Sequence, residues 1–325
     1  MRVFLAGGTG AIGRRLVPQL VARGHEVTAT TRDPDKAEIL FTLGATPVLM
    51  DGLDGASVGE AIAKAQPEAI IHEMTALAGT PDFKHFDRWF AQTNRLRTEG
   101  TEHLLAAAKA SGVRRFVAQS YTGWTNTRSG SLIKTEADPF NPDPAPVQRA
   151  TLAAIQFVEE AVTSAPLDGI VLRYGNLYGP GASEAMVEIV RGHKMPIVGN
   201  GAGVWSWLHV DDAAAATVAA VEGTQCGIFN IVDDEPAAVS EWLPFLAEAL
   251  GARQPMHVPA WLAKFVIGDG GVQLMTVGRG SSNEKAKREL GWRPIWSSWR
   301  EGFRHGLIDS PRAMPVDIHR HLTAA

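Results

Sequence analysis

Apolar runs of strand length alternate with amphipathic segments of helix length along the first half of the chain. The longest helical segment covers residues 83–110, and the apolar runs cover 2–6, 25–30, 46–50, 69–72 and 115–118. Such alternation predicts parallel strands joined by crossover helices, because a parallel pair needs a long connection. We therefore expect an α/β protein with a Rossmann-type, doubly wound parallel sheet.

Closely spaced glycines follow the first apolar run and precede a helical segment at 14–22. Gly7 suits a tight turn, Gly10 lets backbone approach a pyrophosphate, and Gly13 lets the helix pack closely on the strand. A helix N-terminus favours negative charge, because its N–H groups are unpaired. This context predicts a dinucleotide site that includes, besides the three glycines, Thr9, Ala11 and Ile12.

The end of the second predicted strand indicates which dinucleotide is bound. An acidic residue there bonds the adenosine ribose, whereas a basic one accommodates a 2′-phosphate. The strand ends at Thr30-Thr31-Arg32, and no carboxylate precedes Asp33. Arg32 offers a charged fork suited to phosphate, which favours NADP over NAD. Alternatively, Arg32 is a solvated loop residue and Asp33 contacts the ribose.

The remaining strands deliver further candidates to the same edge, because ligands bind at the carboxyl ends of parallel strands. Asp51 follows the third strand and is a candidate for the adenine amino group, although it or Asp54 could instead cap the next helix. Met74 and Thr75 follow the fourth strand and should border the cofactor. His72 is expected to point into the core.

Composition narrows the class of protein. The 325 residues are 45% hydrophobic and 20% charged, with a net charge of -4, so we expect a globular protein without a nucleic-acid partner. Cys226 is the single cysteine, and no Cys/His cluster has metal-ligand spacing. The chain opens without signal-peptide character and has no membrane-length apolar run. These observations predict a cytoplasmic protein without a metal site or a membrane partner.

Four sequence blocks resemble the extended short-chain dehydrogenase/reductase family, in its epimerase/dehydratase branch. They cover nearly the whole length and occur in the family's order: 7–13, 172–181, 207–213 and 283–294. The first is similar to the family's phosphate loop. The second is similar to the strand whose loop passes the nicotinamide, which implies cofactor roles for Tyr174, Asn176 and Leu177. Tyr178 is expected to pack.

The resemblance fails at the proton-transfer residues. The family usually carries Tyr-x-x-x-Lys after strand five, but none of the three tyrosines lies between Thr122 and Arg173. Tyr121 could donate a proton instead, with Ser120 or Thr122 polarising the same oxygen and Lys134 as the missing cation. Alternatively, Tyr121 is a packing residue and Lys134 is solvated.

The second half predicts a smaller lobe over the strand ends. Residues 1–173, about 205–235 and 283–295 are assigned to the dinucleotide-binding domain, 179–204 and 236–282 to the C-terminal substrate lobe, and 296–325 to a tail. Large apolar side chains of the lobe either line a substrate cleft or form its core: Met186, Ile189, Met195, Trp205, Trp207, Trp261, Phe265 and Met275. A flap is predicted at 123–148.

The leading prediction is an NADP(H)-dependent oxidoreductase that acts on a small, mainly apolar carbonyl or alkene. Two alternatives stay open: an epimerase or isomerase that recycles its cofactor, and a non-catalytic dinucleotide-binding regulator. Similar proteins form a homodimer through a helix pair that corresponds to 83–110 and 144–163, so a homodimer is also expected.

Overall fold

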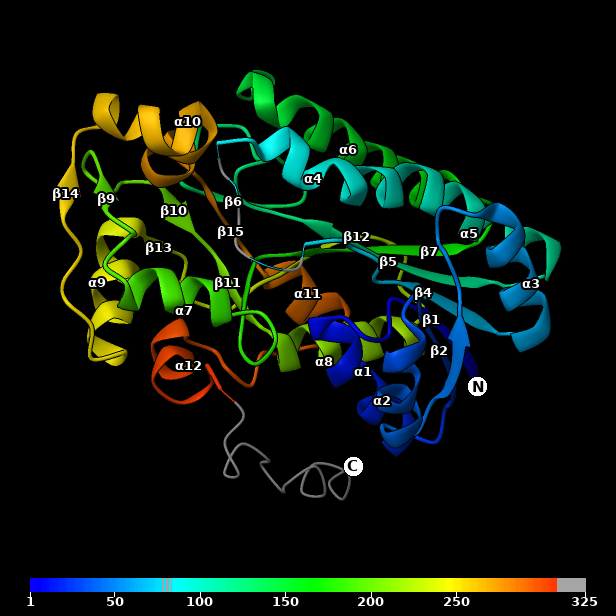
Figure 1. Ribbon diagram of the computed structural model, residues 1–325. Helices are drawn as coiled ribbons and strands as arrows, with labels where there is room; N and C mark the ends of the chain where they lie inside the picture. Colours follow the sequence, from blue (N-terminus) through cyan, green and yellow to red (C-terminus); the bar gives the residue numbers. More distant parts are fainter. Residues whose placement is uncertain (78, 80–81, 83, 309–325) are drawn as a thin grey trace.

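A seven-stranded parallel sheet forms the centre of the molecule (Figure 1). The computed structural model describes all residues except 78, 80, 81, 83 and 309–325. The strand order is β12-β7-β5-β4-β1-β2-β3, with every neighbouring pair parallel. The strands are β1 (Arg2–Ala6), β2 (Glu26–Thr31), β3 (Thr46–Leu49), β4 (Ala69–His72), β5 (Arg115–Tyr121), β7 (Asp168–Tyr174) and β12 (Gly227–Ile231). This arrangement confirms the predicted doubly wound α/β fold.

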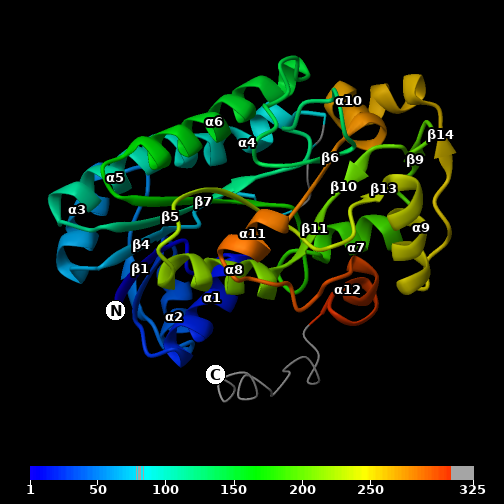
Figure 2. The same ribbon diagram turned by 180° about the vertical axis from the view of Figure 1, so that it is seen from behind.

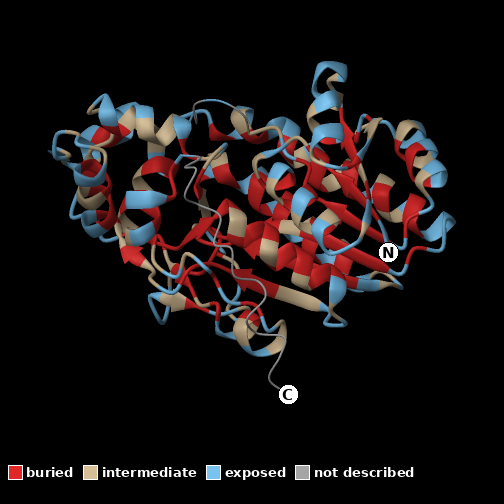
Figure 3. Cartoon of the chain, turned by 90° about the horizontal axis from the view of Figure 1, so that it is seen from below, coloured by how far each residue is buried: buried red, intermediate tan, exposed pale blue. Residues whose placement is uncertain are grey.

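Helices cover both faces of the sheet (Figure 1). One face packs against α1 (Ala11–Ala22), α2 (Ala37–Thr42), α8 (Val210–Glu222) and α11 (Glu284–Glu289). The other packs against α3 (Gly55–Ala65), α5 (Thr101–Ala110) and α6 (Arg149–Ser164), and α4 (Phe86–Arg95) packs against α6. The strands are nearly continuous apolar runs because both of their faces are buried. Buried residues accordingly concentrate in the sheet and on the helix surfaces against it (Figure 3).

The long helix predicted at 83–110 contains an irregular turn. A π-helical segment, Leu96–Gly100, joins α4 to α5 without breaking the chain direction. Such turns are rare and often occur at functional sites. Residue 83 lies outside the described residues.

A smaller lobe lies beyond one end of the sheet, most clearly seen in the reversed view (Figure 2). Its helices are α7 (Glu184–Arg191), α9 (Val239–Ala249), α10 (Ala260–Val277) and α12 (Trp299–His305). Short strand pairs complete the lobe and link it to the sheet domain: β6 (Ile133–Lys134) with β15 (Gly280–Ser281), β8 (Asn176–Tyr178) with β11 (Trp207–His209), β9 (Ile197–Val198) with β14 (His257–Val258), and β10 (Val204–Trp205) with β13 (Ala237–Ala238).

Two expectations for this lobe change. Helix α12 is not part of a tail, because Trp299 and Phe303 are buried in the lobe core. The predicted cleft aromatics also divide differently: Trp205 and Trp207 belong to that core, whereas Trp261 is 68% exposed. Core packing, the alternative reading, therefore describes the buried tryptophans. The rest of the predicted tail, from 309 on, lies outside the described residues.

Candidate functional site

The turn between β1 and α1 is shaped by glycines that leave no room for a side chain. Gly7 has φ = +102°, and a Cβ there would lie 2.7 Å from the Glu73 carbonyl oxygen. A Cβ on Gly13 would lie 2.5 Å from the Gly7 carbonyl oxygen, so α1 packs this closely only without a side chain. A Cβ on Gly10 would meet only the Gly7 oxygen, at 3.4 Å, and Gly10 is exposed. Gly10 therefore leaves space for a ligand to approach the backbone.

The N-terminus of α1 suits a diphosphate. Gly10 is the N-cap and supplies no capping side chain, and the first turn contains no acidic residue. The N–H groups of Ala11 and Ile12 are therefore available to an anion. Arg14 adds a positive charge beside the turn, because its Nε donates to the Thr9 carbonyl oxygen at 3.0 Å. The predicted loop residues thus lie together in a geometry that fits the phosphates of a dinucleotide.

Arg32 and Asp33 lie at the end of β2, and only Asp33 uses its side chain in contacts with neighbouring residues. Asp33 accepts from the Asp35 N–H at 3.1 Å, and its second oxygen lies 3.4 Å from Lys36 Nζ. Arg32 is exposed and makes no hydrogen bond or ion pair with the residues that the structure describes. Asp33 therefore stabilises its own turn, whereas the Arg32 guanidinium is available to a ligand.

The next candidates follow β3 and β4, two strands that β1 and β2 separate in the sheet. Asp51 is exposed and accepts from the Leu53 N–H at 3.0 Å, while Asp54 caps α3. Asp54, and not Asp51, is therefore the N-cap of α3. Met74 is buried and packs against Gly52. A Cβ placed on Gly52 would lie only 2.4 Å from the Met74 sulfur. Thr75 is exposed at the edge of the sheet.

Tyr121 and Asn176 meet at the end of the site expected to hold the nicotinamide. The Tyr121 hydroxyl donates to Asn176 Oδ1 at 3.0 Å, and Asn176 Nδ2 donates to the Ser206 carbonyl oxygen at 3.1 Å. Burial raises the pKa of Tyr121 far above its usual value, and the Asn176 hydrogen bond opposes this only in part. Tyr121 is therefore a neutral donor. Leu177 follows Asn176 and packs against the core of the sheet domain.

Tyr174 lies below the phosphate turn, away from the position implied by the resemblance. Its hydroxyl is buried, donates to Glu73 Oε1 at 2.8 Å and lies 2.6 Å from Thr217 Oγ1. Burial raises the pKa of Glu73 to about 8, although the Tyr174 hydrogen bond lowers it. Tyr174 and Glu73 therefore form a neutral buried pair beneath the turn, and the structure gives Tyr174 a supporting role.

The Ser120 side chain is hydrogen-bonded to a buried ion pair, Glu159 with Arg173. Its hydroxyl donates to Glu159 Oε1 at 2.6 Å, and Arg173 donates to both oxygens of Glu159 at 2.7 and 2.6 Å. All three side chains are at most 5% exposed. This network fixes α6 to β5 and β7, so the Ser120 hydroxyl is directed away from a substrate oxygen.

Thr122 and Lys134, the two other catalytic candidates, are also occupied. Thr122 Oγ1 lies 2.6 Å from Ser281 Oγ and is buried. Lys134 is 1% exposed, and its ammonium donates to the Ser129 carbonyl oxygen and to Asp138 Oδ1. Lys134 is thus neither solvated nor bonded to Tyr121, and it stabilises its own loop. Of the four catalytic candidates, only Tyr121 forms a hydrogen bond with a predicted cofactor residue, Asn176.

Arg97 is a buried arginine near Tyr121 that was not among the site residues predicted from the sequence. Arg97 lies in the π-helical segment, is 5% exposed, and its Nε and Nη1 have no hydrogen-bond partner among the described residues. Burial lowers its pKa to about 10, so it stays a cation at neutral pH. Burial has the largest effect on the pKa of Tyr121 and raises it. The Asn176 hydrogen bond and, to a smaller extent, the Arg97 charge lower it. An arginine inside a helical segment gives no sequence signal of burial.

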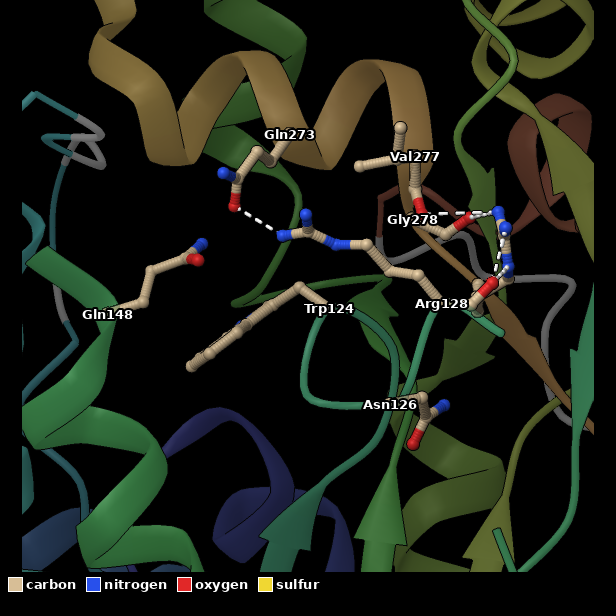
Figure 4. Close-up of a pocket in the computed structure, with 8 residues that line it drawn as sticks. Trp124, Asn126, Arg128, Gln148, Gln273, Val277 and Gly278 are labelled. Carbon is tan, nitrogen blue, oxygen red and sulfur yellow. Dashed lines mark hydrogen bonds between the residues drawn. The ribbon is translucent and has the colours of Figure 1, made fainter. Parts of the chain in front are cut away.

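A pocket opens where the 124–128 loop, α6 and the end of α10 meet (Figure 4). The ring of Trp124 lies at one side, and its centroid is 6.2 Å from that of Tyr121. Arg128 and Gln148 face the space from opposite sides (Figure 4). The residues around it are Trp124, Asn126, Arg128, Gln148, Gln273, Val277, Gly278 and Arg279. We call it the Arg128 pocket.

Comparisons with known proteins agree with this geometry. The pattern of the NAD dependent epimerase/dehydratase family matches residues 3–231. A "3-diazoavenalumate denitrifying reductase" of Streptomyces sp is 43% identical over 93% of this chain and 99% of its own. A "2-alkyl-3-oxoalkanoate reductase" of Stenotrophomonas maltophilia (strain K279a) is 29% identical over 78% of this chain and 76% of its own.

The solved structures show a similar architecture. UDP-glucose 4-epimerase of Thermus thermophilus, in complex with NAD, superposes with a TM-score of 0.73 at 26% identity, covering 94% of this chain and 98% of that one. Within the described residues, none of the helices combines the length and apolarity needed to cross a membrane.

Proposed function

Because this chain belongs to the NAD dependent epimerase/dehydratase family and is an NAD(P)-dependent oxidoreductase, we propose that it reduces an aromatic diazo compound with NADPH. The observation that carries this proposal is the similarity of 43% over almost the full length of both chains to a denitrifying reductase. The proposed reaction replaces the diazo group of an arene by hydrogen.

The chemistry of this reaction agrees with the missing Tyr-x-x-x-Lys. An arenediazonium ion already carries the positive charge that a carbonyl acquires only by protonation. When bound, the reduced nicotinamide supplies a hydride, whose electron pair forms the new C–H bond. The C–N electron pair leaves with N₂, so the neutral arene forms without any proton donor. A carbonyl, in contrast, needs a general acid at its oxygen.

The residues around the reacting end would then orient the substrate and limit access of water. Tyr121 stays neutral, and its hydroxyl is held by Asn176, so it presents a dipole and an aromatic ring without exchanging a proton. Trp124 adds a second aromatic surface beside it. The Glu159–Arg173 pair holds the strand that carries Tyr121 in place. Such rigid positioning is the main contribution required for a hydride acceptor that is already activated.

NADP is the cofactor we propose, on the evidence of Arg32. Its guanidinium is exposed at the end of β2, and Asp33 is engaged in its own turn. Arg14, which bonds the Thr9 carbonyl oxygen, adds positive charge at the phosphate turn. A 2′-phosphate at the end of β2 would meet the Arg32 guanidinium, which can donate two parallel hydrogen bonds.

Reduction of a carbonyl is the second candidate, favoured by the position of Tyr121. Its hydroxyl is the one candidate donor bonded to a cofactor-loop residue, and Arg97 lies near enough to influence its pKa. The oxoalkanoate reductase relative bears a name consistent with this chemistry. Here Tyr121 would give its proton to the oxygen that gains charge.

A labelling experiment with Tyr121→Phe separates these functions. The enzyme is incubated with NADPH carrying deuterium at the transferred position and either a benzenediazonium salt or an aryl ketone, with enzyme-free controls. We expect N₂ release and deuterium on the ring carbon, with a Tyr121→Phe rate within about 3-fold of the wild-type rate, because no proton is transferred.

Three other outcomes would each overturn the proposal. A ketone reduced with a Tyr121→Phe loss of about 10²–10⁴-fold would establish carbonyl reduction. Conversion of a substrate without net NADPH consumption would indicate a cofactor-recycling epimerase. Cofactor binding without turnover of either compound would indicate a regulator.

A further inference from the structure

We propose that the Arg128 pocket binds the carboxylate of a flat, conjugated substrate, with Arg128 as the residue that pairs with this carboxylate. The inference names the substrate class of the proposed reductase site and in that sense rests on the proposed function. The binding claim itself depends only on the pocket.

The backbone of Arg128 is fixed by a second arginine. Arg279 Nε and Nη2 both donate to the Arg128 carbonyl oxygen, at 3.2 and 2.7 Å. Its Nη1 donates to the carbonyl oxygens of Val277 and Gly278, at 3.2 and 3.4 Å. The Arg279 donors are thus used on backbone carbonyls, and Arg279 ties the 124–128 loop to the end of α10. It positions Arg128 and leaves Arg128 as the ligand-binding cation.

The Arg128 guanidinium has no counter-ion. Its side-chain partner is the neutral amide of Gln273, whose Oε1 accepts from Nη2 at 2.6 Å. No carboxylate of the described chain lies within ion-pairing distance of it, whereas Arg173, for example, is paired with Glu159. A half-buried guanidinium without a counter-ion is costly, because burial removes part of its hydration. An anion in the pocket would remove that cost.

Gln148 supplies a second, unused donor on the opposite side. The residue is 1% exposed, and its Nε2 has no hydrogen-bond partner in the described part of the chain. Its amide is directed toward the pocket from the start of α6 (Figure 4). Buried amide groups are normally paired, so an unpaired donor beside a cation without a counter-ion indicates an acceptor that binds between them. A carboxylate, with two oxygens, can accept from both.

Trp124 connects the anion site to the reacting end. Its ring packs edge-on against Phe86, at 5.5 Å between centroids, which fixes its plane. Its other neighbour is Tyr121, which is bonded to the cofactor-loop residue Asn176. A planar substrate could lie along Trp124 with its carboxylate at Arg128 and its reducible group near Tyr121. An aryl ring conjugated to a short unsaturated acid has this shape and charge.

Calorimetry tests binding of a carboxylate at Arg128 without any turnover of substrate. The full-length protein, saturated with NADP⁺ so that no reduction can occur, is titrated with cinnamate and with methyl cinnamate. We expect the acid to bind at least about 10-fold more tightly than the ester, since a charge-assisted hydrogen bond is lost in the ester. Arg128→Met should weaken the acid about 10–100-fold and leave the ester within about 2-fold, whereas Arg128→Lys should keep part of the preference.

Arg149→Met is the matched control, because it removes one positive charge from an arginine at the start of α6 whose side chain is 65% exposed. It should change neither affinity, and thermal unfolding of each variant establishes that it is folded. Equal binding of acid and ester by the wild type, no binding of either, or an unchanged acid affinity in Arg128→Met would each overturn the carboxylate site. Failure of diazo reduction alone would overturn the proposed reaction and leave this result standing.

Discussion

The phosphate turn and the Arg128 pocket are built in opposite ways. The turn consists of consecutive residues, and its shape follows from the absence of side chains at Gly7 and Gly13. The pocket joins the 124–128 loop, the start of α6 and the end of α10, and its character depends on polar groups that lack partners. Backbone geometry therefore gives the phosphate turn its shape, whereas side chains give the Arg128 pocket its chemical character.

Changing Gly13 should cause the largest loss, because the turn has no room to adjust. In Gly13→Ala the new Cβ would lie 2.5 Å from the Gly7 carbonyl oxygen and 2.6 Å from that of Gly8, so α1 must move away. We expect NADPH affinity to fall by about 100-fold or more and stability to fall by about 1–3 kcal/mol. Calorimetry and urea unfolding measure the two effects.

Gly59→Ala is the control for this substitution. Gly59 lies inside α3, and a Cβ there would meet nothing within 4 Å. The change should therefore stabilise the protein by about 0.5–1 kcal/mol, because alanine is the better helix former. If Gly13→Ala behaved like Gly59→Ala, the close packing of α1 on the turn would not be what forms the phosphate site.

Replacing Arg32 should have a smaller and selective effect. Arg32→Ala removes a guanidinium that has no partner among the described residues, so the fold loses little. We expect NADPH to bind about 10–100-fold more weakly and NADH to change by less than about 3-fold, since only the 2′-phosphate is affected. Arg23→Ala, which removes an exposed arginine paired with Glu222, should leave both unchanged. Equal losses for the two coenzymes would show that Arg32 does not distinguish them.

The sequence predicted the elements whose signal is local. The glycine turn and the first four strands follow from spacing along the chain, and the structure has these strands within one residue of the predicted bounds. The fifth strand continues to Tyr121, three residues beyond its predicted end. The catalytic candidates were chosen by position alone, and position does not reveal partners. Ser120 is bonded to Glu159, 39 residues away, and Thr122 to Ser281, 159 residues away. Arg128 and Gln148 carry no motif, so the neutral partner of Arg128 and the unpaired Nε2 of Gln148 could be found only in the folded chain.

The smallest expected effect concerns the carboxyl group beneath the phosphate turn. Glu73 is 6% exposed, and burial raises its pKa from 4.5 to about 8, so it is mostly protonated at neutral pH and does not repel a diphosphate. The unfolded chain loses this proton near pH 4.5, whereas the folded chain retains it to about pH 8. Between these values the unfolded state binds fewer protons, so this group makes stability fall as pH rises.

Glu73→Gln removes that titration and keeps an oxygen that can accept from Tyr174. Urea unfolding between pH 5 and 8 should show a flatter dependence than the wild type, with a relative gain on the order of 2 kcal/mol at pH 8. NADPH affinity at pH 7 should change by less than about 3-fold, because Glu73 carries little charge there. Glu60→Gln, an exposed substitution on α3 with the same change in formal charge, is the control. If Glu73→Gln and wild type lost stability in parallel, Glu73 would already be ionised in the folded protein, and the phosphate turn would have to bind its ligand above a buried negative charge.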